Sequence, residues 1–244
     1  MDTTTPTASS IVLVPGHWLG AWAWDAVAAD LRGRGHHVTA VTLPGLEPDH
    51  PRSAPTTLAQ QADAVRSAVD AAAADGSPVV LVAHSGAGTP VSVVLDRDPA
   101  VIARVVYADS GPAADGAAFD ASVPEEIEDV ELPPFDRLRE KASLDGLSED
   151  DLERFRERAV PEPGSVMREA VRLVNDSRRD VPVTIIACSF PSEVMMQMAH
   201  ESHPMMAEVA TLRDLDLIDL PTGHWPMWSR PADLAAAIAT AASH

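Results

Sequence analysis

Three side chains of this sequence have the types and positions that nucleophilic catalysis needs. Ser85 follows a short apolar run in VVLVAHSGAG, and Ala83 and Ala87 flank it two positions away on either side. Asp109 and His224 each follow another short apolar run. A serine hydroxyl is a poor nucleophile at neutral pH, and it needs a histidine to take its proton and a carboxylate to orient that histidine. These residue types indicate acyl-transfer chemistry.

The stretch around Ser85 predicts a sharp turn between a strand and a helix. Residues 79–83 are typical of a buried strand, and residues 89–97 carry apolar side chains at helical spacing. A nucleophile elbow needs such a turn, with the serine in a strained backbone conformation and small residues around it. Alanines stand here where glycines are usual, which is a mild departure. A serine that only caps a buried helix is the alternative interpretation.

The elements that must position these residues alternate between strands and helices. We expect strands at Ile11–Val14, Val38–Leu43, Val79–Ala83, Val101–Ala108, Val181–Ala187 and Leu215–Leu220. We expect helices at Ala21–Arg32, Leu58–Ala74, Thr89–Arg97 and Pro231–Ala242, and a methionine-rich helix around Met195 to Met206. This alternation predicts an α/β fold with a mostly parallel sheet and helices on both faces. Functional residues of such sheets collect at the carboxyl ends of the strands, where Ser85, Asp109 and His224 can converge.

Residues 111–180 interrupt the alternation with prolines, acidic residues and short helical patterns. One helix is expected to begin at Ser148, since acidic residues fill the turn that follows. No strand pattern is visible here, so we expect a mostly helical cap, or lid, inserted into a core of residues 1–110 and 181–244. A chain of 244 residues, 45% of them hydrophobic, is long enough for one such domain.

Composition limits the partners that the protein can have. The net charge is −19, with 37 acidic and 18 basic residues, which argues against nucleic acid or an anionic membrane as a partner. Cys188 is the only cysteine, and His200 and His203 lack an obvious third ligand, so we expect no metal and no cofactor. The polar start and the absence of long apolar runs predict a cytoplasmic protein. The oligomeric state, a homodimer included, stays open.

The chain resembles the α/β-hydrolase superfamily over nearly its whole length. Within it, the resemblance is to the small esterases of the hydroxynitrile lyase and methyl-esterase group. The stretches that carry it are IVLVPGHWLGAWAWDAVAADLRGRGHHVTAVTLPG, AHSGAG and PTGHWPMWSRPADLAAAI.

The resemblance implies a role for each matching residue. Ser85 would be the nucleophile, and His224 the general base and then the general acid. The backbone N–H groups of His17 and Gly86 would form an oxyanion hole, although Pro15 stands where the family usually has histidine. The His17 side chain either points into the pocket or lies on a surface turn.

The acid that orients His224 is open between two residues. The family usually places an aspartate just after the strand expected at Val181–Ala187, but residues 188–193 hold none. Some α/β-hydrolases are similar in carrying the acid one strand earlier, which corresponds to Asp109. Glu193 is the alternative, and we favour Asp109 because it sits directly at a strand end. A dyad without an acid is the third option, and it would slow acyl transfer heavily.

The predicted function is a cofactor-independent serine hydrolase that cleaves a small hydrophobic carboxylic ester or lactone through an acyl-enzyme on Ser85. Trp18, Phe190 and Trp225 lie near strand ends and are candidates for substrate binding, with core packing as the alternative. Hydroxynitrile lyases of the group carry lysine where Trp225 stands, so cyanohydrin cleavage is not expected. A small-molecule binding protein and a non-hydrolytic biosynthetic catalyst, each with a weakened triad, remain alternatives.

Overall fold

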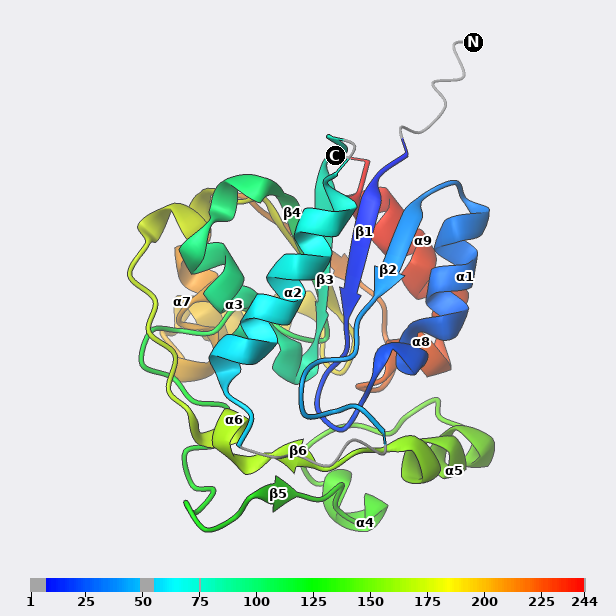
Figure 1. Ribbon diagram of the computed structural model, residues 1–244. Helices are drawn as coiled ribbons and strands as arrows, with labels where there is room; N and C mark the ends of the chain where they lie inside the picture. The colour runs from blue at the N-terminus through cyan, green and yellow to red at the C-terminus, as the bar shows by residue number, and fades with distance from the viewer. Residues whose placement is uncertain (1–7, 49–54, 75, 244) are drawn as a thin grey trace.

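The computed structural model describes residues 8–48, 55–74 and 76–243. Within them, a six-stranded sheet forms the centre, in the order β2-β1-β3-β4-β7-β8 (Figure 1). All neighbouring strands pair in parallel, so their carboxyl ends meet at one edge of the sheet. The strands are β1 (Ser10–Val14), β2 (His37–Ala40), β3 (Val79–His84), β4 (Ile102–Ala108), β7 (Val183–Ala187) and β8 (Leu215–Asp219).

Helices cover both faces of the sheet, and this confirms the predicted fold class. The first face packs against α2 (Leu58–Ala72), α3 (Gly88–Arg97) and α7 (Ser192–His200), and the second against α1 (Asp25–Gly33) and α9 (Pro231–Ala241) (Figure 1). Side chains of β1 alternate between the two faces, with Val12 and Val14 on the first and Ile11 and Leu13 on the second. Both faces are apolar, which explains the continuous apolar runs in the sequence.

The predicted element boundaries agree with the structure to within a few residues. The largest difference among the strands is at the end of β2, which stops at Ala40 although its expected range extends to Leu43. The predicted start of a helix at Ser148 is confirmed: Ser148 and Asp151 form a capping box at the beginning of α5 (Glu149–Arg158).

Among the described residues, no helix is both long enough and apolar enough to cross a bilayer. The remaining α-helices are α4 (Phe135–Leu138), α6 (Gly164–Arg168) and α8 (Pro226–Ser229).

Residues 111–180, here called the insertion, carry α4, α5 and α6 across the carboxyl edge of the sheet (Figure 1). They differ from the expectation in two respects, since loops rather than helices make up most of them, and β5 (Asp129–Val130) and β6 (Glu162–Pro163) pair as an antiparallel ribbon. The sequence pattern missed this ribbon because two residues are too few to show alternation. Pro163 also argues against a strand, although proline is tolerated at an edge.

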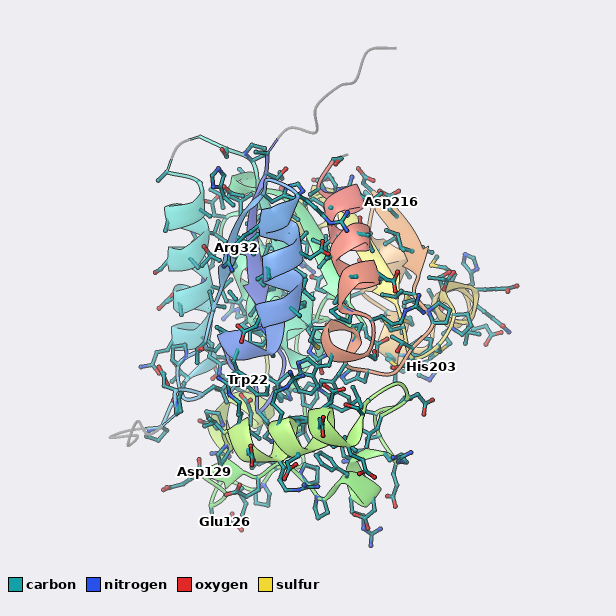
Figure 2. All side chains as sticks on the ribbon, turned by 90° about the vertical axis from the view of Figure 1, so that its right-hand side faces the viewer. Trp22, Arg32, Glu126, Asp129, His203 and Asp216 are labelled. Carbon is teal, nitrogen blue, oxygen red and sulfur yellow. The ribbon has the colours of Figure 1, made fainter. Side chains whose placement is uncertain are left out.

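Aromatic side chains join the insertion to the core of the protein. Trp22 lies at the junction (Figure 2) and stacks on Trp228, with ring centroids 5.5 Å apart. The Arg158 guanidinium from α5 lies over Trp22 at 4.6 Å, and Arg154 lies over Trp228 at 5.3 Å. Phe155 is fully buried and packs against Trp228 in the second-face core. This contact fixes α5 above the carboxyl edge of the sheet.

The burial of Phe155 generates a stability prediction. Phe155→Ala should lower the free energy of unfolding by about 3–5 kcal/mol, since a buried aromatic ring is replaced by a cavity. Glu153→Ala, at an exposed position of the same helix, is the matched control and should change it by about 0.5 kcal/mol at most. Urea unfolding measures both values. Equal midpoints for Phe155→Ala and wild type would contradict the role assigned to this ring.

Candidate active site

Ser85, His224 and Asp109 come from different segments and meet at the carboxyl edge of the sheet. Ser85 follows β3, Asp109 follows the neighbouring strand β4, and His224 lies on the loop after β8. The His224 Nε2 atom is 2.8 Å from the Ser85 Oγ atom, and the Nδ1 atom is 2.6 Å from an Asp109 carboxylate oxygen. This continuous hydrogen-bonded chain is able to move a proton from a serine hydroxyl to an oriented imidazole.

The backbone at Ser85 is strained, as the elbow motif predicted. Its φ angle is +52°, in the left-handed region that residues with side chains rarely adopt. Gly16 allows the loop after β1 to approach, because a Cβ atom there would lie 2.7 Å from the Ser85 Cβ atom. The Ser110 hydroxyl donates a hydrogen bond of 2.6 Å to the Ser85 carbonyl oxygen. Contacts on both sides therefore hold the turn in this conformation.

Asp109 is held as a carboxylate by several donors. The backbone N–H groups of Cys188 and Ser189 donate to one oxygen at 3.1 and 2.8 Å, and the Ser189 hydroxyl donates to the other at 2.5 Å. Burial raises the pKa of Asp109, but the hydrogen bonds from His224 and Ser189 outweigh it and hold the pKa at about 2. An ionised Asp109 accepts a hydrogen bond from the Nδ1–H group of His224, which leaves the Nε2 atom free to accept the proton of the Ser85 hydroxyl.

Of the two candidate acids, the structure brings Asp109 and not Glu193 to the Nδ1 atom of His224. Glu193 lies in the first turn of α7 with an exposed side chain. The loop after β7, where the family usually has its acid, instead supplies the N–H donors of residues 188 and 189 to Asp109.

His84 is a buried neighbour of the site that the sequence analysis did not single out. Its Nε2 atom is 2.7 Å from the His224 carbonyl oxygen, which can only accept, so Nε2 donates. Burial, followed by the nearby His224, lowers the pKa of His84 to about 3 and keeps the ring neutral. The His224 N–H group donates to the Ser143 carbonyl oxygen of the insertion at 2.8 Å. The backbone of His224 is thus fixed from two directions. The signal in the sequence that could have identified His84 as a site residue is its position directly before Ser85.

The structure also brings His17 and Gly86 together beside Ser85. A Cβ atom on Gly86 would lie 2.2 Å from the His17 Nε2 atom, so the imidazole rests against the glycine. The His17 side chain is buried, and Phe119 of the insertion meets its ring edge to face, with centroids 4.0 Å apart. Of the two placements left open for His17, the interior one is observed.

A small cavity lies beside the elbow, next to Gly86 and Ala87. Core loops and the insertion both contribute to its walls. Its apolar lining includes Leu43, Leu46, Pro90, Phe119 and Val166.

The three aromatic residues expected to bind substrate are not among the residues that line this cavity. Trp225 is only 2% exposed and packs against Phe155, because it anchors the insertion. The Trp18 indole N–H donates to the Val130 carbonyl oxygen at 2.9 Å, which ties the loop after β1 to β5. Phe190 packs against the first-face core. Each of the three residues therefore has a packing contact in the structure, and a role in substrate binding stays a prediction.

Known proteins resemble the chain over most of its length. A model of the alpha/beta hydrolase family matches residues 11–237. Esterase PIR7B of Oryza sativa subsp. japonica is 34% identical over 44% of this chain and 40% of its own, so the chain matches less than half of that relative. Probable hydrolase R7 of a Phoma species is 28% identical over 96% of this chain and 98% of its own. The structure of the Arabidopsis methylesterase MES16 superposes with a TM-score of 0.75 at 20% identity, covering 97% of this chain and 99% of that one.

The hydrogen bond from His84 to His224 predicts a difference between two substitutions. His84→Leu removes the donor and should slow modification of Ser85 by a fluorophosphonate about tenfold, the effect of one lost hydrogen bond. His84→Gln keeps a donor of similar reach and should react within about threefold of wild type. Mass spectrometry of the modified protein over time gives the rates. Equal rates of Ser85 modification in His84→Leu and His84→Gln would contradict a positioning role for His84.

The low pKa of His84 predicts how stability depends on pH. The pKa is 6.5 in the unfolded chain and about 3 in the folded one, so only the unfolded state gains this proton between these values. Stability should therefore fall as pH decreases below 6.5, with up to about 1.4 kcal/mol per pH unit from this residue.

Replacement of His84 tests this dependence directly. His84→Gln cannot titrate, so its free energy of unfolding should fall less steeply than that of wild type between about pH 6 and 4.5. His37→Gln changes an exposed histidine and should keep the wild-type slope. Urea unfolding at several pH values measures the slopes, and a wild-type slope in His84→Gln would contradict the buried neutral state.

Proposed function

Because the chain belongs to the alpha/beta hydrolase family, we propose that it is a serine hydrolase that cleaves a small hydrophobic carboxylic ester or lactone without a cofactor. The observation that carries the proposal is the chain of hydrogen bonds from Ser85 through His224 to Asp109. Relatives named as an esterase and as a probable hydrolase support the substrate class.

The reaction follows from the positions of these groups. The Ser85 Oγ atom attacks the carbonyl carbon while His224 Nε2 takes the hydroxyl proton, and the carbonyl oxygen becomes an oxyanion. Backbone N–H groups of His17 and Gly86 donate to that oxyanion. Collapse expels the alcohol, which takes the proton from His224, and leaves an acyl group on Ser85. Water then attacks the acyl carbon with His224 again as the base, the bond to the Ser85 Oγ atom breaks, and Oγ takes the proton back from His224 as the carboxylic acid leaves.

Asp109 and the insertion complete the proposed mechanism. With its pKa at about 2, Asp109 stays ionised and stabilises the imidazolium that forms on His224. We assign the insertion the role of a cap over the site. The contact of Phe119 with His17 supports this role, as does the part that Phe119, Glu162 and Val166 take in the cavity lining.

Hydrolysis of p-nitrophenyl acetate and butyrate by matched variants tests the proposal. Ser85→Ala and His224→Ala should lower kcat by about 10⁴-fold or more, because each removes a member of one catalytic unit. Asp109→Asn should cost about 10³–10⁴-fold through the wrong imidazole tautomer. Glu193→Gln is the control for loss of a nearby carboxylate and should match wild type.

The outcomes separate the proposal from its alternatives. Ester hydrolysis that survives in Ser85→Ala would overturn the acyl-enzyme on Ser85. A wild type that neither hydrolyses esters nor reacts with a fluorophosphonate would favour the two alternatives, a small-molecule binding protein or a non-hydrolytic catalyst.

A further inference from the structure

The cavity beside Gly86 is small, and its lining is not uniformly apolar. It measures about 10 Å³, which is close to the space that one water-sized group needs. Four polar side chains, His17, Gln61, Thr89 and Glu162, share the lining with apolar residues, and all of them but Thr89 are buried. Polar groups placed in a buried apolar site provide specificity when a ligand pairs with them.

His17 stands out among the three buried polar residues. The Gln61 amide donates to the Pro44 carbonyl oxygen at 3.2 Å, and the Glu162 carboxyl group accepts from the Trp18 N–H group at 3.2 Å. The His17 Nδ1 atom, in contrast, has no hydrogen-bond partner within the described part of the chain. Buried polar atoms are nearly always paired, so an unpaired one at a candidate site points to a ligand.

The His17 imidazole is neutral at physiological pH. Burial, followed by the nearby His224, lowers its pKa to about 4. A neutral imidazole offers one N–H donor and one lone-pair acceptor. It cannot form an ion pair with an anionic substrate group, and the Glu162 carboxyl group in the same lining makes the cavity still less suited to a carboxylate. A neutral group that both donates and accepts, such as a hydroxyl, fits the lining best.

The cavity lies on the acyl side of the scissile bond. In the proposed mechanism the leaving alcohol takes a proton from His224, so it must lie near that imidazole. Among the described residues, the lining comes from the loops after β1 and β2, from α2, from Gly86 and its neighbours, and from the insertion, and none of it comes from the loop that carries His224. The acyl part therefore faces His17.

We propose that the His17 side chain is a specificity-determining residue that binds a hydroxyl group on the acyl part of the substrate, one or two carbons from the scissile carbonyl. The inference rests on the proposed ester hydrolysis. The short distance follows from the chain itself, because the His17 backbone N–H group donates to the oxyanion while its imidazole rests on Gly86. The preferred substrates are then α- or β-hydroxy esters rather than plain alkyl or aryl esters.

Paired substrates test this preference. Methyl mandelate and methyl phenylacetate differ only in an α-hydroxyl group, and the pair methyl 3-hydroxybutyrate and methyl butyrate does the same at the β carbon. Wild type should show kcat/KM at least about tenfold higher for the hydroxylated ester of one pair or both. His17→Leu removes both ring nitrogens and should bring the ratio close to one, whereas His17→Asn keeps a donor and an acceptor and should retain part of it. The ratio within a pair cancels any general change in activity that the substitutions cause.

Each result bears on one proposal or the other. Ratios near one in wild type would overturn the role of His17, as would ratios that His17→Leu leaves unchanged. Hydrolysis of p-nitrophenyl butyrate without hydrolysis of either hydroxy ester would overturn it too. Circular dichroism verifies that the variants fold. If neither variant folds, the kcat/KM ratio of wild type is the test, and a ratio near one overturns the preference for hydroxy esters. Absence of hydrolysis of every ester, with Ser85 unreactive towards a fluorophosphonate, would instead overturn the proposed function.

Discussion

The strained turn at Ser85 is the constraint on which the rest of the site depends. A residue with a side chain at a φ angle of +52° persists only where its surroundings hold it. Two glycines permit the required close approaches, since a Cβ atom on Gly16 would meet Ser85 and one on Gly88 would lie 2.2 Å from the Gly111 carbonyl oxygen. β3 lies between β1 and β4, so the loops that follow all three strands reach the turn.

The position of the acid shows how parallel strands allow the same geometry to be built in two ways. β4 and β7 are neighbours, so the loops after both end within reach of His224. Here β4 provides the carboxylate of Asp109, and the loop after β7 provides the N–H donors that hold it. The hydrogen bond from His224 lowers the pKa of Asp109 most, and the donors of Ser189 on the loop after β7 lower it further.

Local sequence patterns are sufficient to locate the strands of the sheet and to place Ser85 and His224 at strand ends, because an apolar run followed by a turn marks each of them. The choice between Asp109 and Glu193 was not decidable in the same way, because it depends on how two loops approach one imidazole. A position near a strand end does not separate a tryptophan that packs from one that binds substrate, and Trp225 is buried against Phe155. The β5–β6 ribbon was missed because two-residue strands lack periodicity.

The two buried histidines affect His224 through their charge. Protonation of His17 or His84 would place a positive charge near the imidazolium that forms on His224 in the proposed mechanism. Burial lowers both pKa values, to about 4 and about 3, and so keeps both rings neutral where His224 must accept a proton. Lowered histidine pKa values reduce stability in acid, because unfolding then takes up protons. The arrangement therefore lowers stability in acid, and it leaves the Asp109 carboxylate next to the His224 imidazole while neither buried ring carries a positive charge.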